Sequence, residues 1–176
     1  VFLDTLQYIQ PVMVMKQGKI VARDGELLKY PNIDYSEIIC QPRPGLTGLK
    51  REDFKLEPIE ISPDGKQAKL VALYMGMPAY LGEYWFPYEN GQVVIPDDMR
   101  YLTVIERYPH NGKPRKIING LVSQYNMKTG AVASVYASLA PQICVVGENY
   151  DDMYAAALAM DQYDGGYLSV KDGKVT

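Results

Sequence analysis

The sequence predicts an α+β protein, in which a mixed or antiparallel sheet with a few packed helices follows a β-hairpin. Segments of strand length that are rich in β-branched and aromatic residues outnumber the helical segments and are interleaved with them late in the chain. The 176 residues, of which 47% are hydrophobic and 22% charged, are enough for a domain with a core.

The hairpin is the first predicted element. Residues 12–16 and 19–23 form its strands, with Gln17-Gly18 as the turn, and Asp24-Gly25 supplies a second turn directly after it. From residue 30 to about residue 66, prolines and glycines interrupt the chain repeatedly, which predicts a connector with short extended pieces. We therefore expect a domain boundary near residues 28–48.

Most of the predicted strands lie after this connector. Residues 68–75 and 77–85 predict a second hairpin with Gly76 at its turn. The run at residues 143–147 is continuously apolar, which is typical of a buried central strand. The remaining strands are expected at residues 101–107, 116–123 and 167–170.

Two helices are expected in the second half of the chain. The stronger candidate covers residues 151–162, with Asn149 or Asp151 as its N-cap and acidic residues in its first turn. The Asp-Gly-Gly segment at residues 164–166 is expected to end it, because glycine adopts the left-handed conformation of a helix stop. The second candidate covers residues 128–137, which are small and apolar.

The composition argues against two classes of partner. The formal net charge is −3 and the basic residues form no stripe, so we expect no nucleic acid as a partner. No apolar run approaches the roughly 20 residues of a membrane-spanning helix, so we expect no membrane partner. Residues 1–4 do not have the pattern of a signal peptide, and we expect a cytoplasmic protein.

The sequence offers no ligand set for a catalytic metal. His110 is the single histidine and lies in a Pro-His-Asn-Gly turn, where we expect it to be exposed to solvent. A hydrolytic zinc site usually needs two or three imidazoles, or one imidazole with two thiolates. Cys40 and Cys144 are expected to be free thiols in a reducing compartment, with a disulfide or a catalytic thiol as alternatives. We expect no metal and no cofactor in this chain.

Several acidic residues have both a chemical and a structural interpretation. Glu106 and Arg107 end a predicted strand and point to opposite faces, so one of them can face a pocket, or both make ordinary strand-end contacts. The acidic pairs at residues 97–98 and 151–152 fit a turn and a helix start. Glu83 lies among aromatic residues that fit a stacking surface for a planar ligand, a core face or a subunit interface. None of these forms a recognisable catalytic set.

Residues 1–4 with 12–25 form one stretch, and several segments between residues 50 and 175 form another, in which the chain resembles adenine deaminases of the amidohydrolase superfamily. Residues 1–4 and 12–25 resemble the segment in which such enzymes return from the metal-binding barrel to a small β-sandwich. The later stretch is similar to the family's "V-x-E-R" strand and to its "G-L-K-x-G-A-x-A-S" motif. The matching segments are residues 50–54, 102–108, 126–134, 143–147, 151–153, 165–166 and 172–175.

The resemblance implies three regions. Residues 1–28 are the carboxy-terminal strands of a composite β-sandwich, residues 29–48 are a linker, and residues 49–176 are the carboxy-terminal α+β domain. The family's metal ligands lie on the barrel. The resemblance therefore implies a divalent metal (Mn, Fe or Zn) in the parent protein's barrel and no metal ligand in this chain.

The resemblance also singles out one loop. Where the family typically has His-Asp-Ser-His-Asn, this chain keeps neither histidine and has lost the aspartate, and the new side chains include no strong proton donor. The residues of this loop are Ser138, Leu139, Ala140, Pro141 and Gln142. We expect the loop to lie nearest the substrate. Glu106, Arg107 and Lys128 are candidate supporting residues, and no residue is assigned as catalytic.

Two functions follow from the resemblance. In the first, the parent protein hydrolyses adenine to hypoxanthine and ammonia with a metal-activated water, and this chain is an accessory part that is not catalytically complete alone. Its partners are then the barrel of the same protein, further copies in a homo-oligomer and a small purine-like substrate. In the second, the chain is a structural, oligomerisation or ligand-binding module of a diverged amidohydrolase and has no chemistry.

Overall fold

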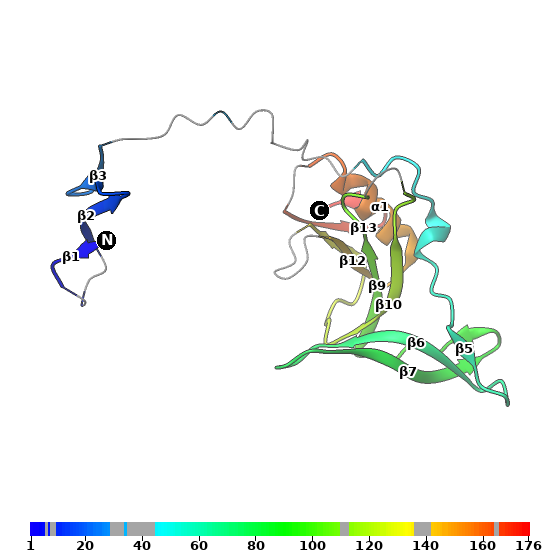
Figure 1. Cartoon of the computed structure of the whole chain (residues 1–176). Helices are drawn as coiled ribbons and strands as arrows, with labels where there is room; N and C mark the ends of the chain where they lie inside the picture. Colours follow the sequence, from blue (N-terminus) through cyan, green and yellow to red (C-terminus); the bar gives the residue numbers. More distant parts are fainter. Residues whose placement is uncertain are drawn as a thin grey trace. The chain divides into compact units, whose positions relative to one another are not determined.

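The computed structural model describes residues 1–5, 7, 10–28, 34, 45–109, 113–135, 142–163 and 166–176. The chain folds into two compact units, Val1–Gln41 and Pro42–Thr176. Each unit contains its own sheet (Figure 1).

The first unit is a four-stranded antiparallel sheet in the order β1-β2-β3-β4. The predicted hairpin is confirmed, because β2 and β3 pair around Gln17 and Gly18, which have φ of 52° and 73°. Positive φ at both turn residues is typical of two-residue hairpin loops. None of the described residues of this sheet is buried. The strands are Phe2–Leu3 (β1), Pro11–Lys16 (β2), Lys19–Arg23 (β3) and Glu26–Leu27 (β4).

The second unit contains a ten-stranded sheet in the order β14-β13-β11-β12-β9-β10-β6-β7-β8, with β5 beside β6. Strands β10 and β6 are parallel and the other pairs are antiparallel, so the sheet is mixed. In Figure 1, β6 and β7 turn away from the direction of β9 and β10. The strands are Glu60–Ile61 (β5), Gln67–Tyr74 (β6), Tyr80–Glu89 (β7), Gln92–Val93 (β8), Met99–Ile105 (β9), Ile117–Ser123 (β10), Ala131–Ser134 (β11), Ile143–Gly147 (β12), Tyr167–Lys171 (β13) and Lys174–Val175 (β14).

The described part of the chain holds one α-helix, Tyr150–Met160 (α1), and one short 3-10 helix, Arg51–Phe54 (η1). The protein is therefore mainly β, with a mixed sheet, and the expectation of a few packed helices is corrected to one. With 11 residues, α1 is too short to cross a membrane, and no longer helix occurs among the described residues.

The predicted helix at residues 128–137 is wrong where the structure describes it. Residues 131–134 form β11, which pairs with β12 on one side and β13 on the other. Ala131 and Ala133 are buried and alternate with half-buried neighbours, which is the period of a strand. Small residues favour a helix in isolation, but here they let α1 approach the sheet closely. Residues 136 and 137 lie outside the described residues.

The predicted helix at residues 151–162 is confirmed, but its stop is not the glycine segment. Helix α1 ends at Met160, and Asp161 caps it in a right-handed conformation. Backbone bonds of the i→i+3 type close the last turn, from Gln162 N to the Ala159 carbonyl (3.0 Å) and from Tyr163 N to that of Met160 (3.1 Å). Asp164 and Gly165 lie outside the described residues.

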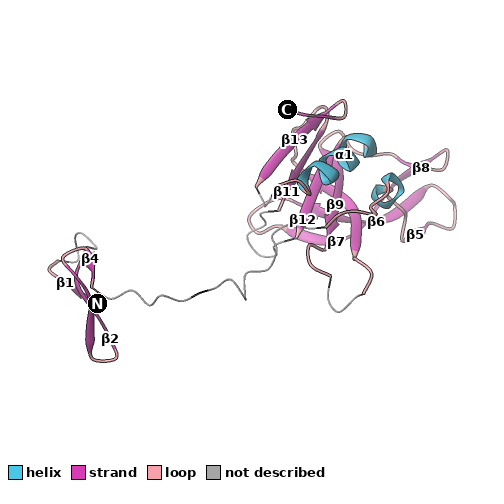
Figure 2. Cartoon of the chain, turned by 90° about the horizontal axis from the view of Figure 1, so that it is seen from above, coloured by secondary structure: helices cyan, strands magenta, loops and turns pink. Residues whose placement is uncertain are grey.

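One face of the large sheet, the inner face, is covered by α1, which packs on β11, β12 and β13 (Figure 2). Met153, Ala156 and Met160 of the helix are buried with Val145 and Ile105 of the sheet. Leu46 and Phe54 are also buried in this cluster, so the chain before the first long strand contributes to the core. The pairing register fixes which residues of every strand face this core and which face away from it.

Candidate functional site

Polar groups from three segments meet at the carboxy-terminal end of β9. The Arg107 N–H donates to Gln142 Oε1 at 2.8 Å. The Lys116 N–H donates to Glu106 Oε2 at 3.1 Å, and the Glu106 N–H donates to the Lys116 carbonyl at 2.9 Å. The β9–β10 connection and the segment before β12 are thus joined at one point.

Arg115 completes this cluster. Its Nη1 donates to the carbonyls of Glu106 and Arg107, the latter at 3.1 Å, and its Nη2 donates to the Gly45 carbonyl at 3.1 Å. Burial lowers the pKa of the Arg115 guanidinium, while the nearby charges of Asp161 and Glu106 act in the opposite direction. An arginine fork that donates to several carbonyls holds the backbone of this strand end in a fixed position.

The predicted substrate-proximal loop is described at one residue. Gln142 is half-buried and accepts from Arg107, whereas residues 138–141 lie outside the described residues. The Arg107 guanidinium lies over the ring of Tyr108, with its carbon 5.1 Å from the ring centroid. The structure therefore brings Glu106 and Arg107 beside Gln142.

Lys128 lies elsewhere. It is exposed and follows Met127, whose carbonyl accepts from Arg100 Nε at 2.5 Å. Arg100 lies near the first residue of β9, and Glu106 lies just beyond its last one. At ~3.3 Å per strand residue, roughly 20 Å separates the two ends of β9. Lys128 is thus not brought together with Glu106 and Arg107.

Two surface hollows flank Ile95 and Tyr101, away from this cluster. One of about 380 Å³ is also lined by Asp97, Arg100 and Glu148, and the other, of about 270 Å³, by Tyr150. The rings of Tyr101 and Tyr150 lie 4.6 Å apart.

The chemistry of this tyrosine pair is fixed by burial and by backbone contacts. Burial raises the pKa of the Tyr101 hydroxyl well above its usual range, and a hydrogen bond with Tyr150 acts in the same direction. Tyr150 Oη in turn accepts from the Leu56 N–H at 3.2 Å. A neutral, hydrogen-bonded hydroxyl of this kind holds neighbouring segments together.

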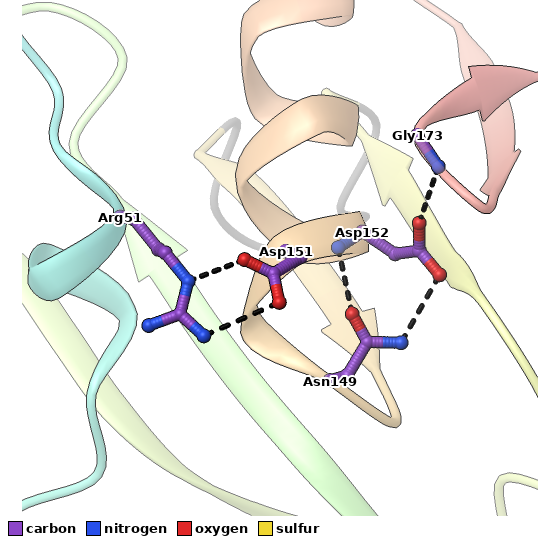
Figure 3. A network of polar contacts seen from close by, with 5 residues as sticks. All are labelled: Arg51, Asn149, Asp151, Asp152 and Gly173. Carbon is purple, nitrogen blue, oxygen red and sulfur yellow. Dashed lines mark hydrogen bonds and ion pairs between the residues drawn. The ribbon is translucent and has the colours of Figure 1, made fainter.

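The acidic pair at residues 151–152 starts the helix, as its sequence context indicates (Figure 3). Asn149 Oδ1 accepts from the Asp152 N–H at 2.8 Å, and Asn149 Nδ2 donates to Asp152 Oδ2 at 3.0 Å. The Gly173 N–H donates to Asp152 Oδ1 at 2.8 Å. Asp151 pairs with Arg51 on the surface. The Asn149–Asp152 contacts cap the helix, and the contacts with Gly173 and Arg51 join α1 to neighbouring segments.

The described residues do not fit a divalent metal. No three side chains of the His, Cys, Asp and Glu types come together among them in a way that could hold an ion. Cys144 is a free, half-buried thiol whose pKa is raised by burial, while Cys40 and His110 lie outside the described residues. No step of a metal-dependent reaction is therefore assigned to this chain.

Sequence reasoning missed the two residues that organise these sites. Arg115 follows Pro114 in a connection between strands, and the three carbonyl acceptors of its guanidinium come from residues 8 to 70 positions away. Tyr150 is one of fifteen tyrosines in the sequence. The one local signal for Tyr150 is that it follows the N-cap Asn149, which places it in the first turn of α1.

Comparison with known proteins identifies the family. Residues 82–176 match the family model described as the adenine deaminase C-terminal domain. The adenine deaminase of Desulforamulus reducens is 30% identical over 186 residues, which cover 99% of this chain and 29% of the relative. Adenine deaminase 1 of Rhizobium etli is 27% identical over 195 residues, which cover 100% of this chain and 30% of the relative. Adenine deaminase 1 of Rhizobium johnstonii is 40% identical over 84 residues, which cover 48% of this chain and 14% of the relative. The chain thus spans about three tenths of the length of the first two relatives.

Proposed function

We propose, on the premise that this chain belongs to the adenine deaminase C-terminal domain family, that it is the carboxy-terminal portion of an adenine-deaminase-like, metal-dependent hydrolase. The observation that carries the proposal is the match of nearly the whole chain to 29% of a relative named adenine deaminase. The proposed reaction of the parent protein is the hydrolysis of adenine to hypoxanthine and ammonia, for which a divalent metal held outside this chain would supply an activated water. The metal is Mn, Fe or Zn, and the protein is cytoplasmic.

Three regions of the chain have different roles in this proposal. Residues 1–28 complete a β-sandwich whose other strands belong to the rest of the polypeptide, and residues 29–48 are a linker. Residues 49–176 form a domain that covers the barrel and supports a homo-oligomer. The chain is proposed not to be catalytically complete by itself, and its match to about three tenths of the length of relatives named adenine deaminase supports this.

The loop at residues 138–142 is proposed to lie nearest the purine-like substrate. Support comes from Gln142, whose amide oxygen is tied to the Arg107 backbone at the same strand end as Glu106 and Arg115. That network gives the end of the loop a fixed anchor, as a substrate-facing segment requires. Glu106 and Arg107 act as positioning residues in this arrangement.

Ammonia release from adenine tests the proposed reaction. The full-length parent protein and the 176-residue chain are assayed side by side with manganese, iron or zinc added. We expect activity in the parent and none in the chain alone. If a parent protein with measured bound metal releases no ammonia, the proposed reaction is wrong.

A paired substitution tests the loop. In the active parent protein, Gln142→Ala removes the acceptor of the Arg107 N–H, and we expect kcat/KM to fall roughly threefold to tenfold, the effect of one lost hydrogen bond. Lys128→Ala is the matched control, because Lys128 is exposed near the opposite end of β9. Equal effects of the two substitutions would contradict the assignment of the loop.

A second candidate function is a non-catalytic structural, oligomerisation or ligand-binding module. The loss of both histidines and the aspartate in the loop at residues 138–142 favours it. A parent protein that binds metal, forms its oligomer and releases no ammonia from adenine would support this second function.

A further inference from the structure

The outer face of the large sheet, opposite α1, carries a row of side chains that runs across five strands. The pairing register aligns Ile118 of β10 with Val104 of β9, and Val104 with Cys144 of β12. Cys144 is aligned with Ser134 of β11, and Ser134 with Tyr167 of β13. These five residues, the outer row, contain no charged side chain.

The outer row is exposed at its two ends and partly exposed between them. Ile118 is 56% exposed and Tyr167 is 68% exposed, while the three residues between them are half-buried. The inner residues on either side of Val104 and Cys144 in the same strands are fully buried, as Ile105 and Ile143 are. The one α-helix of the described residues covers the inner face. The row is uncharged and, apart from Ser134, made of apolar or aromatic residues, which is the composition of a candidate interaction surface.

The position of the row suggests what covers it. Cys144 lies two residues after Gln142, and Val104 lies two residues before Glu106, so the row borders the strand-end cluster that anchors the loop at residues 138–142. If that loop lies nearest the substrate, as proposed above, then the surface beside it faces the part of the polypeptide that holds the substrate.

We propose that the outer row docks on the catalytic part of the same polypeptide. This proposal rests on the proposed function. The first two relatives are more than three times as long as this chain. In a parent protein of that length, the catalytic part would be covalently joined to the domain that carries the row. A tether of this kind gives an effective concentration in the millimolar range, at which a modest apolar strip is enough for docking.

The thiol of Cys144 is a built-in probe of this contact, because it lies at the middle of the row. The full-length protein and the 176-residue chain are labelled with a maleimide under native conditions at the same mildly alkaline pH. Digestion and mass spectrometry then separate the Cys144 peptide from the Cys40 peptide. We expect Cys144 to react at least about tenfold more slowly in the full-length protein, because docking covers the row.

A substitution pair tests the same contact without the thiol. Ile118→Lys places a charge in the outer row, and Val175→Lys places one at a valine that is 51% exposed and aligned with Val170 of the inner face. In the 176-residue chain we expect both variants to have the melting temperature of the unsubstituted chain. In the full-length protein we expect Ile118→Lys alone to restore rapid labelling of Cys144.

Each outcome decides the proposal. Equal labelling rates of Cys144 in the two proteins overturn the docking, even if the full-length protein is active. Slow labelling of the 176-residue chain that depends on its concentration assigns the row to a second copy of the chain, and slow labelling at all concentrations assigns it to another segment of the chain itself. Ammonia release is read separately, so failure of the proposed function leaves the labelling result intact.

Discussion

At the residue scale, the start of α1 depends on the side chain of Asn149. Its Oδ1 occupies the Asp152 N–H, one of the backbone donors that have no partner within the helix. Asn149→Ala removes this acceptor, and we expect the free energy of unfolding to fall by about 1 kcal/mol. Urea unfolding followed by circular dichroism measures the loss. Asn126→Ala, at an exposed loop position, is the control and should leave the midpoint unchanged.

Asp152 links stability to pH. The Gly173 N–H and, less strongly, the Asn149 side chain hold the pKa of its carboxyl below the usual value of 3.8. A carboxyl whose pKa is lowered by folding stabilises the protein above its unfolded pKa, and this contribution is lost as the pH falls through the folded pKa. Asp152→Asn should therefore destabilise the protein by about 1.5 kcal/mol near neutral pH, the range for hydrogen bonds to a charged group.

In acid, the free energy of unfolding of the same variant should differ less from that of the unsubstituted protein. Urea midpoints of the two proteins at about pH 7 and about pH 3 measure this difference, because the carboxylate contribution falls as the pH drops through the lowered pKa of Asp152 and the amide variant has no such contribution. Asp98→Asn, at an exposed turn, controls for the change in net charge. A destabilisation of Asp152→Asn that is as large in acid as at neutral pH would contradict the ionic origin of the effect.

The residues of the candidate site were only partly predictable. Glu106 and Arg107 were placed at a strand end because the run before them is rich in β-branched residues. Their contact with Gln142 depends on β9 and β12 being neighbours in the sheet, which no local pattern encodes. Lys128 was grouped with them through the resemblance alone, and the strand direction separates it from them.

At the element scale, the packing of α1 on β12 requires a residue without a side chain at position 147. A Cβ built on Gly147 would lie 2.3 Å from Met153 Cγ and 3.1 Å from Ala131 Cβ. Gly147→Ala should therefore lower the free energy of unfolding by about 1–3 kcal/mol, the usual cost of an overpacked core. Thermal unfolding measures it. Gly76→Ala, whose Cβ would meet only the Pro78 carbonyl at 3.3 Å, is the control with the smaller expected loss.

The strands were easier to predict from the sequence than the helices. The β2–β3 and β6–β7 hairpins were placed correctly because a turn residue lies between two runs of strand-forming residues. The sequence at residues 131–134 is compatible with either element, since alanine and valine carry no turn signal and the segment is short. Pairing on both edges and burial under α1 decide for a strand, and both are tertiary effects.

At the scale of the whole molecule, the two units differ in what holds them together. Pro42–Thr176 encloses a core in which residues from its first segment, such as Leu46, are buried with α1 and the sheet. Val1–Gln41 contains a sheet of four strands in which no described residue is buried. Because a small sheet needs a buried apolar face for stability, the first sheet is expected to depend on strands from elsewhere.

Amide hydrogen exchange tests this dependence. In the 176-residue chain, amides of residues 12–27 should exchange within seconds to minutes, because no described residue of the first sheet is buried. Amides of β9, β10 and β12 should instead be protected by the global stability of the second unit. In the full-length protein, residues 12–27 should gain protection, since the composite sandwich then buries Val12, Val14 and Val21. Strong protection of these residues in a monomeric 176-residue chain would mean that the hairpin finds its partner within the chain, and the composite sandwich would be the wrong explanation for its apolar strands.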